Sequence, residues 1–248
     1  MRNRLFAAAA LAGLLLASSA SRAATYMTIS FNGDFPKYIQ DNGSSDGNPI
    51  LGQITSINDS MATANGFTYS VLSGVSNAPQ PALLGPPSVA ATPSNPDQAR
   101  LQLTSIVARN TGTAAGTLII ELVDNGFVDP TGLVEFASGV GGTLSKTSAG
   151  AAVQSVTLES LIDDGSGVVT SGPQTFSSAQ TYATFQNDRE LPTFTDGPFT
   201  LRQRMSITLV AGGSATISGL TAVTPIPEPL AAGAVGSLLL IALRRRKA

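Results

Sequence analysis

The side chains that most often perform enzymatic or metal chemistry are scarce in this sequence. It contains no cysteine and no histidine, which excludes thiol chemistry, haem attachment, zinc sites of the usual ligand types and catalysis that depends on histidine. Tryptophan is absent as well. The chemistry that remains is oxygen chemistry by carboxylates, amides and hydroxyls, together with charge pairing by arginine.

The densest group of oxygen ligands is the segment Asp41-Asn42-Gly43-Ser44-Ser45-Asp46-Gly47-Asn48. Ca²⁺ prefers such carboxylate, amide and carbonyl groups on a loop, and Asp41 and Asp46 would be its ligands. The spacing departs from that of an EF-hand, because placing Gly47 at the invariant glycine puts Gln53 where a bidentate Glu is required. Since Asn, Asp and Gly also form turns, we expect a turn without a resident cofactor, and calcium is the alternative.

A pair of carboxylates about 5 to 10 Å apart across a sugar would permit glycoside hydrolysis. Acids are available, but nothing in the spacing selects a pair among Glu121, Glu135, Glu159 and Glu190. We interpret the acids within residues 161–167 and 187–190 as solvated turns. Sugar clefts generally offer aromatic platforms, whereas the tyrosines here are scattered (Tyr26, Tyr38, Tyr69 and Tyr182). The sequence therefore predicts a protein that is not an enzyme.

Arg202 and Arg204 share the polar face of one predicted strand. They could hold a carboxylated polysaccharide through bidentate hydrogen bonds. The simpler interpretation, which we prefer, is that they protect an edge strand against aggregation or pair with acids across strands.

Alternating apolar and polar residues, with no long stretch of helical spacing, indicate β structure. The clearest strand is Phe199–Val210, and the glycines after it predict a hairpin with Ser214–Val223. Leu101–Ala108 and Thr117–Val123 predict a second hairpin. The nearly continuous apolar run Leu118–Leu122 indicates the middle of a sheet. Further predicted strands are Tyr26–Phe31, Gly66–Ser73, Gly139–Lys146, Val153–Glu159 and Gln174–Phe185.

Short strands separated by turn residues favour an all-β fold, an antiparallel β-sandwich of jelly-roll or immunoglobulin-like type. The segment 77–96 holds six of the fifteen prolines and is interpreted as a long loop. We expect one sandwich over residues 24–224, in which early strands pair with later ones across this loop. A two-unit arrangement is the alternative.

The first 23 residues have the pattern of a secretory signal peptide. Arg2 and Arg4 precede an apolar stretch, and Ser21-Arg22-Ala23 is a small-x-small cleavage site. We expect cleavage between Ala23 and Ala24, so the sequence predicts an exported protein.

The C-terminus combines a Pro-Glu-Pro triplet, an apolar segment and a basic end. Pro227, Glu228 and Pro229 should be extended, because proline disfavours the helical conformation of the residue before it. The uncharged run from Leu230 to Leu243 predicts a single hydrophobic helix. Such a helix would cover only about 21 Å of a hydrocarbon core about 30 Å thick. The basic cluster follows it and consists of Arg244, Arg245, Arg246 and Lys247.

Together these features resemble the PEP-CTERM sorting tail of exported bacterial proteins, over about a tenth of the chain. The resemblance implies recognition of the triplet by an exosortase, after export by a secretion translocase, and transient insertion of the apolar segment in the inner membrane. The basic cluster would be the retention element. It also implies a Gram-negative producer that makes exopolysaccharide, and a final location at the cell surface or outside the cell, with the tail either removed or kept as an anchor.

The charge of the body restricts its partners. Residues 24–224 contain seven basic and fifteen acidic residues, a net charge of −8, which argues against binding to nucleic acid or anionic lipid. We therefore expect a structural or adhesive protein of the cell surface or of a biofilm matrix. The alternative is a carbohydrate-binding module for exopolysaccharide, and the third possibility is a hydrolase that uses two carboxylates.

Overall fold

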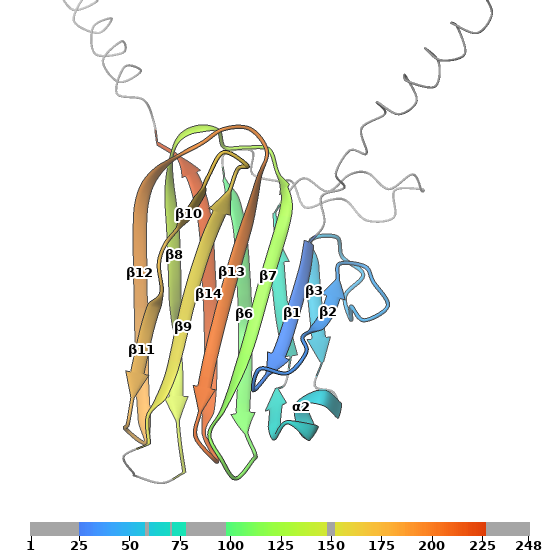
Figure 1. Cartoon of the computed structure of the whole chain (residues 1–248), viewed down its shortest axis with the longest axis vertical. Helices are drawn as coiled ribbons and strands as arrows, with labels where there is room; N and C mark the ends of the chain where they lie inside the picture. The colour runs from blue at the N-terminus through green and yellow to red at the C-terminus, as the bar shows by residue number, and fades with distance from the viewer. Residues whose placement is uncertain (1–24, 58–59, 70, 78–97, 148–151, 227–248) are drawn as a thin grey trace, which may run out of the picture.

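The computed structural model describes residues 25–57, 60–69, 71–77, 98–147 and 152–226 (Figure 1). These residues form two antiparallel seven-stranded sheets and a short helix, α2 (Ser60–Ala64). Sheet A has the order β10 (Val168–Thr170), β9 (Gln154–Asp163), β13 (Phe199–Leu209), β7 (Gly116–Phe127), β1 (Thr25–Phe31) and β2 (Lys37–Gln40), with β11 (Gln174–Ser178) also paired to β9. Sheet B has the order β12 (Tyr182–Thr195), β8 (Gly132–Ser145), β14 (Ser214–Pro225), β6 (Ala99–Asn110), β5 (Val71–Ser76) and β3 (Gln53–Ile57), with β4 (Phe67–Tyr69) paired to β6. The prediction of an antiparallel β-sandwich is confirmed.

Eight of these strands follow a jelly-roll order. From β6 onward the chain moves repeatedly between the sheets, which gives β12-β8-β14-β6 in sheet B and β11-β9-β13-β7 in sheet A. The earlier strands widen this framework, because β1 pairs with β7 and β5 pairs with β6. Figure 1 shows β1, β2 and β3 together at one lateral edge of the sandwich, and β11 and β12 at the other.

Both predicted hairpins are wrong. β6 and β7 lie in opposite sheets, and so do β13 and β14. Each connection therefore crosses the end of the sandwich instead of joining neighbouring strands. Asn110, which is buried, ties the two connections together: its side-chain amide donates to the carbonyl oxygens of Ala114 (2.8 Å) and Leu209 (2.9 Å). Connections do lie at the Gly- and Asn-rich segments, but turn residues do not reveal which sheet the next strand will join.

Other strand predictions are confirmed more closely. Phe199–Val210 corresponds to β13, where Leu201, Met205 and Ile207 are buried and Arg204 is exposed. β7 is an interior strand between β13 and β1, as its apolar run indicated. The segment 174–185 was predicted as one strand, but it contains β11 and the start of β12, which lie in different sheets.

The core lies between the sheets and contains a cluster of hydrogen-bonded polar side chains. Phenylalanine rings fill much of it, with ring centroids 5.6 Å apart for both Phe31–Phe67 and Phe127–Phe199. Within this core the Ser160 hydroxyl lies 2.8 Å from that of Ser138 and 2.6 Å from that of Thr221. Gln174 donates to the carbonyl and hydroxyl oxygens of Ser138. These side chains connect the two sheets through hydrogen bonds as well as apolar contact.

The predicted processing segments lie outside the described residues. This applies to the signal peptide with Ala23 and Ala24, to Pro227, Glu228 and Pro229, to the C-terminal hydrophobic helix and to the basic cluster 244–247. β1 starts at Thr25 and β14 ends at Pro225. In the described part of the chain, no helix has the length and apolar character needed to cross a membrane.

Candidate functional site

A groove crosses the outer face of sheet B, and glycines of β8 form its floor. Along β8 the side chains of Val134, Phe136 and Val140 point into the core. By strand alternation, Gly139 and Gly141 lie on the outer face, where they leave the backbone uncovered. The resulting groove has a volume of about 480 Å³, which is in the range of ligand-binding pockets.

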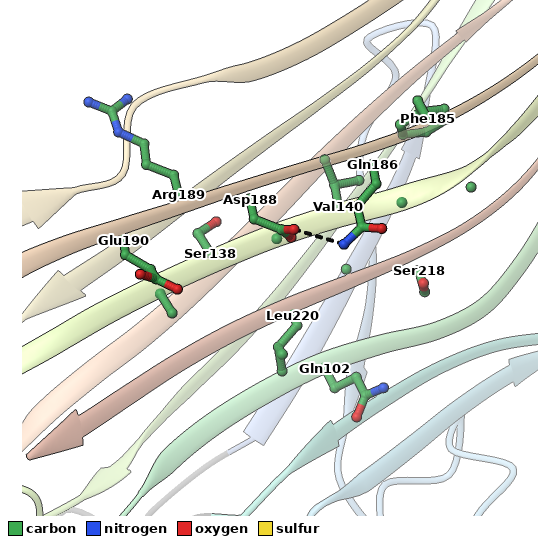
Figure 2. A pocket seen from close by; sticks show the side chains of 15 residues that line it. Gln102, Ser138, Val140, Phe185, Gln186, Asp188, Arg189, Glu190, Ser218 and Leu220 are labelled. Atoms are coloured by element: carbon green, nitrogen blue, oxygen red, sulfur yellow. Dashed lines mark hydrogen bonds between the residues drawn. The ribbon is translucent and has the colours of Figure 1, made fainter.

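The edge strand β12 supplies one wall of the groove. Gln186, Asp188 and Glu190 are two residues apart and therefore share one face of the strand. Pairing places Gln186 opposite Gly141 and Asp188 opposite Gly139. The opposite side consists of Ser218 and Leu220 from β14 and Gln102 from β6. Figure 2 shows Asp188 and Gln186 over β8, with Leu220 and Gln102 on the far side.

Glycine at position 139 leaves room for the Asp188 carboxylate in the position that it takes. A Cβ atom on Gly139 would lie 2.5 Å from Asp188 Oδ1, so the carboxylate rests directly on the β8 backbone. The Gln186 side-chain amide donates to Asp188 Oδ2 at 2.8 Å, as the dashed line in Figure 2 shows. One carboxylate oxygen is thus held by the wall, and the other lies over the floor of the groove.

The groove combines acceptors and donors, and the guanidinium of Arg100 donates to its lining residue Gln102 at Oε1 (2.6 Å). On the outer face of sheet B its lining side chains are two carboxylates, two amides, a hydroxyl, a leucine and an alanine, and Arg189 lies at its border. Arg189 belongs to the other face of β12, and Figure 2 shows its guanidinium pointing away from Asp188. In the described part of the chain, neither Asp188 nor Glu190 forms an ion pair. Such a surface suits a ligand with many hydroxyl groups and disfavours an anionic one.

The segment 187–190 was predicted to be a turn, and this prediction is wrong. It lies in the middle of β12. Apolar and polar residues do not alternate there, because an edge strand at the side of the sandwich exposes both faces.

The run 161–167 includes a turn, as expected: Asp164 Oδ1 accepts hydrogen bonds from the backbone amide (3.0 Å) and hydroxyl (2.8 Å) of Ser166. These bonds, the hydroxyl first, lower the pKa of Asp164.

Asp41 and Asp46 organise a loop. The backbone amides of Asn48 and Thr55 both donate to Asp46 Oδ1 at 2.9 Å, and the amide of Gly52 donates to Asp41 Oδ2 at 2.8 Å. Burial raises the pKa of Asp41. Among the described residues, no three His, Cys, Asp or Glu side chains gather in a way that could hold a metal ion. These contacts match the expected turn.

Arg202 and Arg204 lie on the outer face of sheet A, opposite the groove. Arg202 pairs with Glu121 through two contacts, Nε to Oε1 at 2.8 Å and Nη2 to Oε2 at 2.9 Å, and this bond raises the pKa of Arg202. Cross-strand pairing with an acid is therefore confirmed for Arg202. The edge-strand interpretation is wrong, because β13 lies between β9 and β7.

The four glutamates are spread over both faces. Glu121 and Glu159 flank Arg204 in register on sheet A, Glu135 is on β8 and Glu190 is in the groove.

Sequence reasoning missed the groove. The available signals were three glycines at 139, 141 and 142 inside a predicted strand and polar residues at 186, 188 and 190.

The fold and the groove define a β-sandwich domain with a polar surface groove. No family model matches the sequence, and no curated protein matches it as a relative. Among solved structures, it is similar to TmCBM61 in complex with β-1,4-galactotriose, with 10% identity, a TM-score of 0.30 and coverage of 73% of this chain and 92% of that chain.

Two other similar structures are also of carbohydrate-binding proteins. One is a structure described under the promiscuous specificity of carbohydrate-binding modules from the β-sandwich superfamily. It has 13% identity, a TM-score of 0.27 and coverage of 81% of this chain and 84% of that chain. The other is the CBM22-1 xylan-binding domain from Paenibacillus barcinonensis Xyn10C (15%, 0.25, 75% and 100%). At such low identities and TM-scores, the likeness carries no conclusion about what this chain binds.

Proposed function

We propose that this protein binds a neutral polysaccharide in the groove of sheet B and does not cleave it. The observation that supports this most directly is the glycine floor of β8 beneath Asp188 and Gln186. Bulky residues favour strands, and glycine weakens them. Glycines at 139 and 141 therefore have a cost to the strand, and this cost is offset if they let a ligand approach the backbone.

The chemistry of the walls fits sugar hydroxyl groups. A hydroxyl can donate to Asp188 Oδ1, which has no donor among the described residues, and another can donate to Glu190. The Gln186 side-chain amide has two N–H donors and gives one to Asp188, which leaves one for a sugar oxygen. Leu220 offers apolar contact for the C–H groups of a sugar ring.

The arrangement of the two acids argues against hydrolysis. Glycosidases need carboxyl groups on both sides of the scissile bond. Asp188 and Glu190 project from one face of one strand and so lie on the same wall. We therefore propose binding without catalysis, which agrees with the absence of histidine and cysteine from the sequence.

We propose further that binding takes place outside the cell, on the exopolysaccharide of the producer. This part rests on the predicted signal peptide and on the Pro227-Glu228-Pro229 tail, which resembles an exosortase substrate. A protein delivered there that holds polysaccharide would serve as an adhesive component of a surface layer or biofilm.

Filling the groove tests the proposal. A Cβ atom on Gly141 would find its nearest neighbour, the Phe185 carbonyl oxygen, at 3.5 Å, which is ordinary contact. Gly141→Leu should therefore fold while its side chain occupies the groove. We expect affinity for the producer's exopolysaccharide, measured by affinity electrophoresis, to fall at least about tenfold, a loss of about 1.4 kcal/mol.

The matched control is Thr143→Leu, on the same strand and the same face but outside the groove. It should bind as the wild type does. Equal binding by the wild type and by Gly141→Leu, with both proteins folded, would refute the groove as the binding site.

A further inference from the structure

The outer face of sheet A carries a second group of side chains with sugar-binding chemistry. We call it the tyrosine–arginine strip: Tyr26, Tyr38, Glu121, Arg202 and Arg204. The two tyrosine rings have centroids 5.1 Å apart and are tilted by 31°. Tyr38 is 54% exposed although it is large and apolar over most of its surface. The strip therefore places an accessible aromatic pair beside charged groups.

The pairing register places Tyr38, Glu121 and Arg204 of this strip in one row across the strands, together with Thr28 and Glu159. Thr28 of β1 lies opposite both Tyr38 of β2 and Glu121 of β7. Arg204 lies opposite Glu121 on one side and Glu159 of β9 on the other. Five strands at about 4.8 Å spacing make this row about 19 Å long. Its length suits an extended oligosaccharide that runs across the strands.

The charges of the row favour a neutral sugar. Arg202 is already held by Glu121 at 2.8 and 2.9 Å, and Arg204 lies between two glutamates. A carboxylated sugar would approach these acids as well as the arginines, so the net attraction is small. Exposed Arg204 and Glu159 instead offer donors and acceptors for hydroxyl groups, while Tyr38 offers a ring face for C–H contact.

We propose that the tyrosine–arginine strip is a second binding site for neutral polysaccharide, and that the protein therefore cross-links polysaccharide chains. The cross-linking part rests on the proposed function of the groove. Sheets A and B turn their outer faces to opposite sides of the sandwich. One molecule with a site on each face joins two chains, because each site can hold a different polymer.

The simpler account of the tyrosine pair is that it stabilises the β1–β2 edge of the sheet, as cross-strand aromatic pairs do. That role concerns folding only. It predicts no change in polysaccharide binding when an exposed ring is removed and the fold is kept, so a binding measurement separates the two accounts.

The test compares three variants of the purified protein: Tyr38→Ala, Gly141→Leu and the control Tyr182→Ala. Tyr182 is 60% exposed on β12 and belongs to neither site. Each protein is titrated into the producer's exopolysaccharide. Light scattering reports cross-linked networks, affinity electrophoresis reports binding, and circular dichroism reports folding.

We expect the wild type and Tyr182→Ala to give strong scattering at intermediate ratios of protein to polymer. Tyr38→Ala and Gly141→Leu should each still bind but lose most of the scattering. Should Tyr38→Ala fail to fold, Arg204→Gln replaces it, since Arg204 is exposed and its change leaves the ring pair intact.

Two results distinguish a failure of the second site from a failure of the groove. If folded Tyr38→Ala scatters and binds like the wild type, the second site is refuted while the groove stands. If Gly141→Leu alone keeps full binding and scattering, the proposed function of the groove is refuted. The strip is then tested separately by whether Tyr38→Ala loses affinity.

Discussion

Replacing Gln203 by methionine should stabilise the protein, even though it removes a polar group that neighbours other polar groups. Gln203 is 0% exposed, and neither atom of its side-chain amide has a hydrogen-bond partner among the described residues. Leu122 and Ser160 flank it in register. The Ser160 hydroxyl already forms hydrogen bonds with the hydroxyls of Ser138 and Thr221. It therefore forms none with the Gln203 amide.

The size of the effect follows from the burial of this amide. An unpaired buried polar group costs about 1–3 kcal/mol, and methionine fills a similar volume with an unbranched side chain. Gln203→Met should therefore gain about 1–3 kcal/mol in the free energy of unfolding. For a domain of this size, each kcal/mol raises Tm by about 2–4 °C, so a gain of about 2 kcal/mol gives about 4–8 °C.

Thermal unfolding followed by far-ultraviolet circular dichroism measures this change. The matched control is Gln174→Met, where the amide donates to the carbonyl (3.0 Å) and hydroxyl (2.9 Å) oxygens of Ser138. That variant removes these two buried hydrogen bonds, although it also removes the Gln174 amide oxygen, which has no partner among the described residues, so it should be less stable than Gln203→Met. Destabilisation by Gln203→Met would refute the reasoning, because it would show that the amide is satisfied in the folded protein.

Three further predictions concern a glycine pair, an acid and the tail. Gly141→Ala should leave the free energy of unfolding unchanged or raise it slightly. Gly142→Ala should lower it by about 1–3 kcal/mol, because the added Cβ atom would overlap the backbone carbonyl oxygen of Thr216. Equal Tm values for the two variants would contradict this prediction. The pKa of Asp164 is lower in the folded protein than in the unfolded chain. The ionised carboxylate therefore stabilises the fold above the unfolded pKa, and this stabilisation is lost as the pH falls through the lower folded pKa. Asp164→Asn should flatten the acid side of the stability profile measured by denaturant titration, and an unchanged profile would count against the turn contacts. Glu228→Ala should leave the chain unprocessed or mislocalised, which intact mass of the exported protein detects; a wild-type mature form that still contains residues 230–248 would show that the tail is only an anchor.

Local pattern was enough to predict the sandwich and several of its strands. In β13, apolar residues alternate with polar ones over the whole strand, and only a half-buried strand satisfies that pattern. β7 is nearly continuously apolar, and its outward-facing residues are partly buried as well as its inward-facing ones. The connections were not predictable in the same way. Gly and Asn allow the chain to reverse in a hairpin or between sheets, and the choice depends on distant partners such as the bond from Asn110 to Leu209.

The candidate site depends even more on tertiary structure. Glycines 139 and 141 lie in a predicted strand, but they form a floor only once β12 and β14 lie on either side of β8. β12 itself was largely missed, since an exposed edge strand has no apolar face to reveal it. The tyrosine–arginine strip was hidden for a similar reason. Tyr26 and Tyr38 are far from Arg204 in the sequence, and only the pairing of β1 with both β2 and β7 brings them to one face.

Hydrogen exchange with and without a neutral oligosaccharide of the producer's exopolysaccharide tests the central claim most directly. If the groove of sheet B binds the sugar, backbone amides of residues 139–142 and 186–190 should exchange more slowly in its presence. Protection in the loop at residues 41–48 is not expected. Unchanged exchange at residues 139–142 and 186–190, under conditions where the oligosaccharide is bound, would contradict the account.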